Sequence, residues 1–267
     1  SQDALIDGLD VLVEDGRIVE VSEHPIHAAA AERIDLRGKT LMPGLIDCHL
    51  HVVSTTVDGW ANTLAPSSLI ALKAGRIMET ILQRGFTTVR DCCGADLGLV
   101  MAIEQGVVDG PRLIISGKGL TQTGGHCDQR VRTDDRTQVM EERLGNLGRI
   151  VDGVDNCRLA AREELRKGAK FVKIMANGGV ASPTDPIHSI QYSREEIKAI
   201  VDEAENAGTY VSAHVYTDKA IRRAVECGVH SLEHCNLIQP ETARLAAKAG
   251  AIAVPTLVAY EGLALEG

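Results

Sequence analysis

The feature that most constrains the fold of this sequence is a regular alternation of apolar runs and amphipathic stretches from residue 41 onward. Seven runs rich in Val, Ile and Leu fit strands, at residues 41–49, 86–92, 111–117, 169–176, 209–215, 230–235 and 251–258. Helical patterns lie between them, near residues 66–84, 95–108, 152–167, 193–207, 217–227 and 240–249. Strands that look buried on both faces and alternate with helices predict an α/β fold, in which helical crossovers connect the strands of a parallel sheet.

The ends of these helical patterns carry sequence signals of their own. Ser193 followed by Glu196 forms a capping box, and Pro240 sits where a first-turn proline belongs. Gly208 and Gly250 fit the left-handed residue that closes a helix. The predicted helices are therefore bounded by local chemistry as well as by periodicity.

The number of strand–helix units suggests a barrel. Eight such units in roughly 250 residues close a (β/α)8 TIM-type barrel, and this 267-residue chain supplies about seven. We predict that residues 41–267 form such a barrel without its eighth strand. Residues 1–40 differ, because alternating runs around the turn at 14–17 predict a β-hairpin and residues 33–36 predict a further short strand. The long polar stretch 119–150 is a candidate active-site loop.

Composition and charge limit the partners of the chain. A net charge of -9 argues against nucleic acid and anionic membranes, and no window is apolar enough to span a bilayer. Seven cysteines without a C-x-x-C pair favour a reducing compartment over a disulfide framework. We therefore expect a cytoplasmic protein, which we also expect to be a homo-oligomer, with a small molecule as its partner.

Four predicted strands end in, or carry, residues that suit a metal site. His49 and His51 are two positions apart, so their side chains point the same way from the end of a strand. Lys173, His214 and His234 lie on later strands, whose carboxyl ends would meet at the same rim. Alone, each fits a hydrogen-bonded core histidine or a lysine that reaches solvent. Together they predict a metal site, because buried polar groups cost a few kcal/mol each unless satisfied.

These residues also resemble a known family. The sequence is similar to the amidohydrolase superfamily at residues 43–51 (PGLIDCHLH), 171–174 (FVKI), 214 and 233–234 (EH). Its similarity is greatest to the imidazolonepropionase-related branch, and residues 121–126 (TQTGGH) and 176–183 (ANGGVASP) look most like prolidase-like Xaa-Pro dipeptidases. The resemblance implies metal-dependent hydrolases on a (β/α)8 barrel beside a small β-sandwich domain built from both chain ends. Residues 1–40 would form part of that small domain.

The resemblance also implies a set of metal ligands. His49 and His51 would bind the more buried zinc ion, and His214 and His234 would bind a second one. Lys173 would be carboxylated, and its carbamate would bridge the two zinc ions together with a hydroxide. A free ammonium group has no lone pair to offer, so the modification makes a lysine sensible there.

The same resemblance implies the chemistry of the site. The hydroxide would attack the amide carbonyl of a dipeptide, while His126 would contact and polarise that carbonyl as the catalytic histidine. Tyr216 and Arg130 are candidates to bind the substrate carboxylate, although Arg130 is equally understandable as an ordinary loop charge.

One departure from the family pattern keeps other interpretations open. Family members carry a zinc-binding aspartate on the eighth strand, and no residue after Thr256 fits it. We therefore expect the sequence to be a fragment of a longer protein, which as written would have little activity. One alternative is a hydrolase of a cyclic amide or an N-acyl amino acid. Another is a catalytically inactive fragment that retains the metal-binding fold.

Overall fold

The computed structural model describes residues 5–136, 140–182 and 184–266, which contain two compact units. The first unit is Ser1–Pro43 and the second is Gly44–Gly267. Within the described chain, no helix combines the length and the apolar character needed to cross a membrane.

The first unit contains the predicted hairpin. Strand β1 (Asp10–Glu14) pairs antiparallel with β2 (Arg17–Ser22), and Asp15 and Gly16 make the turn with φ angles of 49° and 72°. The predicted strand at residues 33–36 is wrong, because this segment is irregular. Ile34 is 72% exposed, so burial provides no reason for a strand there. The described residues of this unit therefore confirm the hairpin, and the small β-sandwich domain stays a prediction.

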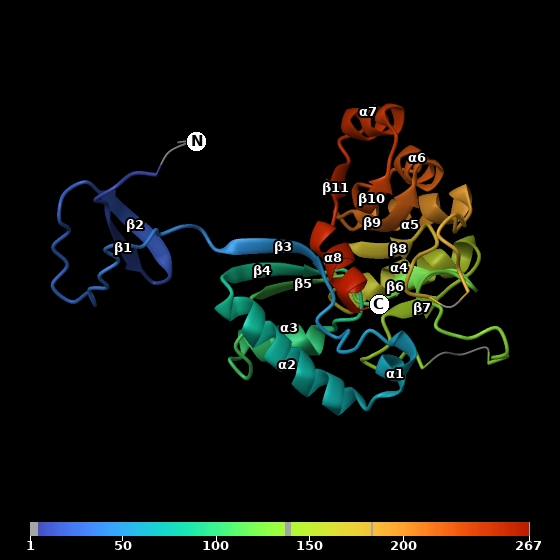
Figure 1. The fold of residues 1–267 in the computed structure, drawn as a ribbon, viewed down its shortest axis with the longest axis horizontal. Coiled ribbons are helices and arrows are strands. Elements are labelled where there is room, and N and C mark those ends of the chain that lie inside the picture. The colour runs from blue at the N-terminus through green and yellow to red at the C-terminus, as the bar shows by residue number, and fades with distance from the viewer. Residues whose placement is uncertain (1–4, 137–139, 183, 267) are drawn as a thin grey trace. The chain divides into compact units, whose positions relative to one another are not determined.

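The second unit is built on parallel strands (Figure 1). One sheet has the order β3-β4-β5, with β3 (Leu45–Leu50), β4 (Phe86–Asp91) and β5 (Arg112–Ile115). The other has the order β11-β10-β9-β8-β6-β7, with β6 (Gly119–Thr121), β7 (Gly148–Ile150), β8 (Val172–Met175), β9 (Val211–Thr217), β10 (Ser231–Leu237) and β11 (Ile252–Val254). The pairings between these named strands are all parallel, as expected for an α/β fold of the TIM-barrel type.

Helices alternate with these strands. They are α1 (Gly59–Leu64), α2 (Ser67–Gln83), α3 (Leu97–Glu104), α4 (Val154–Arg166), α5 (Arg194–Asn206), α6 (Asp218–Glu226), α7 (Pro240–Lys248) and α8 (Leu257–Glu266). The predicted signals are confirmed: Ser193 and Glu196 form both bonds of a capping box, and Pro240 occupies the first turn of α7. Gly208 and Gly250 have φ angles of 70° and 73°, so each provides the left-handed residue that follows its helix.

Three expectations about the strands need correction. The stretch 119–150 is not loop throughout, since its two ends form β6 and β7, which pair in parallel. These strands have three residues each, too few to show a periodic pattern. The predicted strand 251–258 is shorter, because α8 begins at Leu257. Strand β3 is not buried on both faces: Ile46 is 64% exposed, and its only strand partner among the described residues is β4.

The apolar core of the second unit lies around the central strands. Strands β8 and β9 are almost entirely buried, and helices α4, α5 and α6 pack their apolar faces against them. A second cluster joins α2, α3, β4 and β5. Polar side chains also meet inside this unit: Arg90 on β4 forms an ion pair of 2.6 Å with Glu233 on β10. The two sheets therefore face each other across a shared polar interior.

Candidate metal centre

The four histidines predicted as ligands lie together as a series of adjoining rings. The ring centroid of His49 lies 5.1 Å from that of His51 and 4.9 Å from that of His234. The His214 ring lies 4.8 Å from the His234 ring. The rings come from the ends or interior faces of β3, β9 and β10, so the parallel sheet brings together residues that are far apart in sequence.

Each of these histidines has one ring nitrogen close to a hydrogen-bonding partner. Such a partner fixes the orientation of the ring, so the opposite nitrogen can be presented to a metal ion. The four pairs are His49 Nδ1 with Glu233 Oε2 (2.6 Å), His51 Nδ1 with the Cys93 carbonyl (3.3 Å), His214 Nε2 with the Gly178 carbonyl (3.3 Å) and His234 Nδ1 with Thr256 Oγ1 (2.6 Å). This arrangement is typical of histidines that bind metals.

Burial keeps three of the imidazoles neutral. Burial, helped by the nearby charge of Lys173, lowers the pKa of His49 to about 3 and that of His234 to about 2. Burial and the neighbouring histidines His126 and His234 hold the pKa of His214 well below its usual value. A metal ligand must offer an unprotonated nitrogen, so these rings are in the protonation state that metal binding requires.

Lys173 lies in the middle of β8 and is only 1% exposed. Its side chain makes no hydrogen bond or ion pair with the residues that the structure describes. An ammonium group that is buried without a partner is costly. Four closely spaced imidazoles and a buried lysine without a partner fit a metal centre in which nitrogen and oxygen atoms bind the ions.

A different group of donors lies beside this set. His49, Cys92 and Glu233 have ligand atoms within 4.8 Å of one another. However, burial holds the pKa of the Cys92 thiol far above its usual value, and only a thiolate is a good ligand. Oε1 of Glu233 already accepts hydrogen bonds from three side chains. The histidine set is therefore the better candidate.

Two predicted substrate contacts lie next to the histidine rings. The His126 ring stacks on that of His214 at 4.1 Å, and its Nδ1 lies 2.7 Å from Ser182 Oγ and 3.2 Å from Asp185 Oδ2. Tyr216 lies with its ring 5.1 Å from that of His234. Both residues are thus placed where they could contact a molecule bound at the centre.

Arg130, the third predicted contact, is engaged elsewhere. Its guanidinium donates to both carboxylate oxygens of Asp128, at 2.9 and 2.6 Å, and to the Arg136 carbonyl. It lines a pocket with Asp152 and Asn156, and no contact among the described residues joins it to the histidines. Its role with substrate stays a prediction.

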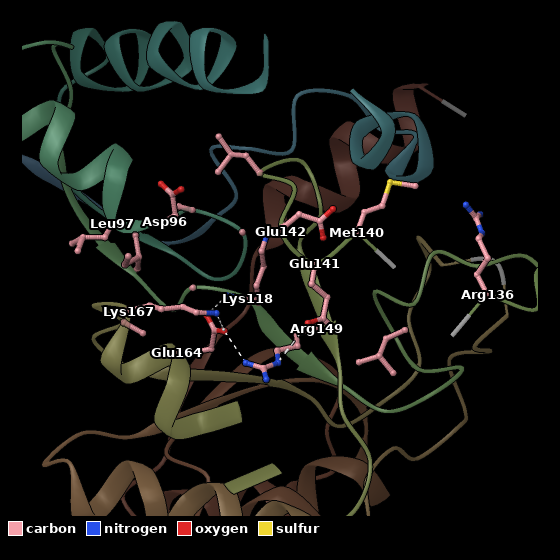
Figure 2. Close-up of a pocket in the computed structure, with 17 residues that line it drawn as sticks. Asp96, Leu97, Lys118, Arg136, Met140, Glu141, Glu142, Arg149, Glu164 and Lys167 are labelled. Atoms are coloured by element: carbon pink, nitrogen blue, oxygen red, sulfur yellow. Dashed lines mark hydrogen bonds and ion pairs between the residues drawn. The ribbon is translucent and has the colours of Figure 1, made fainter. Parts of the chain in front are cut away.

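A larger cavity of about 820 Å³ lies away from the histidines (Figure 2). Figure 2 shows Lys118, Arg149 and Lys167 around the buried carboxylate of Glu164. Glu164 accepts hydrogen bonds from the Lys118 backbone, from Arg149 at 3.4 Å and from Lys167 at 3.1 Å. None of the predicted ligands lines the cavity. The cavity is therefore distinct from the candidate metal centre.

The sequence-based reasoning missed some residues of this site. Arg90 was not singled out, although a charged residue within the apolar run 86–92 is a signal that it serves a purpose. Asp185 and Thr256, which contact His126 and His234, lie outside any motif.

Comparison with known proteins identifies the class. Residues 40–264 match the Amidohydrolase family, so this chain belongs to the amidohydrolase family, as the sequence resemblance suggested. Among curated relatives, ochratoxinase of Aspergillus niger is 38% identical over 232 residues, which cover 82% of this chain and 48% of the relative. Imidazolonepropionase of Acidiphilium cryptum is 27% identical over 269 residues, covering 96% of this chain and 66% of the relative.

A solved structure extends this similarity. A prolidase in complex with N-methylphosphonate-L-proline is 52% identical and superposes with a TM-score of 0.94, covering 96% of this chain and 63% of that one. The chain thus spans about half the length of the ochratoxinase and under two thirds of the prolidase.

Proposed function

We propose that this protein is a binuclear zinc hydrolase that cleaves the amide bond of a small substrate, and that the substrate is a dipeptide of the Xaa-Pro type. The observation that carries this proposal is the cluster of four adjoining histidines beside the buried Lys173. The similarity to a prolidase at 52% identity supports the choice of substrate class.

The predicted ligands fall into two pairs of histidines, one pair for each zinc ion. His49 and His51 would hold one zinc ion, His214 and His234 would hold the other, and a carboxylated Lys173 would lie between them. When bound, the ions supply a water of lowered pKa and polarise the substrate carbonyl. Carboxylation gives Lys173 oxygen ligands and replaces its positive charge with a negative one. This change would satisfy the buried side chain that has no partner among the described residues.

We propose that His126 acts on the scissile carbonyl. Although burial raises the pKa of Asp185, its hydrogen bond with His126 lowers it, so the carboxylate stays ionised. Nδ1 of His126 faces Ser182 Oγ at 2.7 Å and Asp185 Oδ2 at 3.2 Å. When Nδ1 accepts from the closer Ser182 hydroxyl, the ring proton lies on Nε2 and can be donated to a carbonyl oxygen. Such a donor stabilises the negative charge that develops on the oxygen.

The leaving amino acid needs a partner for its carboxylate. Tyr216 is the better of the two candidates, because it adjoins His234, whereas Arg130 is bound to Asp128 on both carboxylate oxygens. The Tyr216 hydroxyl can donate one hydrogen bond to a carboxylate, and burial raises its pKa far above neutrality, so it remains a donor.

A second candidate is hydrolysis of a cyclic amide or an N-acyl amino acid. This candidate is kept because the chain is also 38% identical to an ochratoxinase, a relative that is not named as a prolidase. Loss of activity with retention of the metal-binding fold is the candidate from another class.

The test is a substrate screen with the full-length protein, supplied with zinc and with bicarbonate as a source of carbon dioxide. Xaa-Pro dipeptides, other dipeptides, N-acyl amino acids and cyclic amides are compared at equal concentration, and bound zinc is measured in the same preparation. We expect turnover of Xaa-Pro dipeptides with about two zinc ions per chain, as a binuclear site requires. Turnover of another class alone would select the second candidate, and bound zinc without any turnover would select an inactive protein.

A further inference from the structure

The carboxylate of Glu233 lies at the centre of a buried network beneath the histidine rings. Glu233 is on β10 and is fully buried. Its Oε1 accepts hydrogen bonds from Ser212, Ser231 and Arg90, each at 2.6 Å. Its Oε2 is left for a single contact, with Nδ1 of His49, also at 2.6 Å. The two oxygens therefore have separate partners: one faces the protein scaffold and the other faces a predicted metal ligand.

Arg90 is itself held on several sides. Its Nε donates to the Cys48 carbonyl at 2.6 Å, and Nη1 donates to Tyr210 at 3.2 Å and to Ser231 at 3.0 Å. The centre of its guanidinium lies 5.1 Å from the centroid of the Phe171 ring. A planar guanidinium with this many fixed partners has little freedom to rotate. Arg90 therefore fixes Glu233 from the side opposite His49.

These contacts define which nitrogen of His49 can bind an ion. An ionised carboxylate only accepts hydrogen bonds, so the 2.6 Å contact places the ring proton on Nδ1. The lone pair is then on Nε2, on the opposite side of the ring. The ion pair with Arg90 at 2.6 Å and the donors Ser212 and Ser231 fit a carboxylate that only accepts, so Glu233 accepts the proton of His49.

We propose that Glu233, held in place by Arg90, is the positioning residue that orients His49 and strengthens it as a metal ligand. A carboxylate that accepts the N–H of a ligating histidine increases the basicity of the ring. Loss of that carboxylate commonly weakens metal binding about 10–100-fold. The inference rests on the proposed function, since it concerns the same metal centre. It adds that the affinity for the ion at His49 is set by two residues that do not bind the ion.

The test compares Glu233→Gln with wild type in the full-length protein. Glutamine keeps the size of the side chain and removes the charge. Zinc affinity is measured by competition with a chromogenic chelator, and zinc dissociation is timed after addition of excess chelator. We expect Glu233→Gln to bind the zinc ion held by His49 about 10–100-fold less tightly. Lysine cannot reproduce the planar set of N–H donors of a guanidinium, so Arg90→Lys should also lower the affinity for this ion, to a smaller extent.

Two further variants separate positioning from general damage. Glu203→Gln is the matched control, because Glu203 is a buried carboxylate that pairs with Arg158 and Arg162 and has no contact with the histidines. It should leave zinc affinity unchanged. Ser212→Ala removes one of the three donors to Oε1 and leaves the contact with His49, so it provides a milder test if Glu233→Gln fails to fold. We expect a loss of affinity smaller than that of Glu233→Gln, without loss of folding.

Several outcomes would overturn the proposal. Equal zinc affinity in wild type and in Glu233→Gln, or in Ser212→Ala if that variant is the one that folds, would show that the network serves stability alone. A cobalt-substituted protein with a sulfur-to-cobalt charge-transfer band that Cys92→Ser abolishes would show that Glu233 belongs to a His49–Cys92–Glu233 ligand set. Absence of zinc binding in wild type would refute the proposed function and this inference together, whereas the first two outcomes leave a metal centre in place.

Discussion

Replacing Lys173 by Met should have opposite effects on the metal-free and the zinc-bound protein. Lys173 is 1% exposed and pairs with no described residue, while the nearby Glu233 carboxylate is already paired with Arg90. Its ammonium is therefore a buried charge in excess. Well-packed apolar replacement of buried charges is often stabilising by about 1–4 kcal/mol, so we expect metal-free Lys173→Met to exceed wild type in the free energy of unfolding by that order.

With zinc bound, wild type should be the more stable of the two proteins. Zinc at about a hundredfold its Kd stabilises a protein that binds it by about 2.7 kcal/mol per site, and a variant without the bridging ligand gains less. Urea unfolding with chelator, and then with zinc and bicarbonate, measures both differences. Lys170→Met is the control, since Lys170 is exposed just before the same strand and its loss should change stability by at most about 0.5 kcal/mol. A metal-free Lys173→Met protein less stable than wild type, or an equal gain from zinc in both, would refute the reasoning.

Three further predictions concern the substrate contact, an ion-pair cluster and the core. His126→Ala should lower kcat/KM about 10²–10³-fold with zinc content unchanged, because it removes a donor to the developing oxyanion; steady-state kinetics and metal analysis check this. A hydrogen bond from Arg162, and then one from Arg158 against the effect of burial, hold the pKa of Glu203 below its usual value. Its contribution is therefore present above the unfolded pKa of about 4.3 and is lost as pH falls through the folded value. Glu203→Gln should cost about 1–2 kcal/mol at pH 7, and its urea midpoint should approach that of wild type in acid. Ile200→Ala, at a fully buried position of α5, should cost about 2–5 kcal/mol by urea unfolding with an unchanged slope.

The parts of the fold that the sequence could predict are those with a local cause. The helix α5 begins at a capping box and ends before a glycine with φ of 70°, and both signals lie within the helix and its flanks. The central strands β8 and β9 are buried on both faces, and most of their residues outside the site are apolar. By contrast, β6 and β7 have three residues each and exist through their pairing with each other and with β8. No local pattern marks them.

The same distinction applies to the site. His49 and His51 could be predicted as a pair because side chains two positions apart on a strand share a face. Contact between His49 and Glu233 joins residues 184 positions apart, and that between Arg90 and Glu233 joins residues 143 positions apart. These contacts depend on the sheets facing each other across the interior, which is a property of the assembled fold. A sequence read strand by strand shows the charged residues but not which of them meet.

Charge balance nevertheless connects the sequence of the single strands with the contacts of the assembled fold. Arg90, Lys173 and Glu233 each lie on a strand directed into the polar interior, and two positive charges meet one negative charge there. Burial of an unpaired charge is unfavourable, so such an excess is removed by a partner group, by loss of the proton or by chemical modification. Arg90 is accounted for by its bond to Glu233, which leaves Lys173. The lysine left without a partner among the described residues is also the one that the family resemblance assigns to carboxylation, and the two lines of reasoning reach it independently.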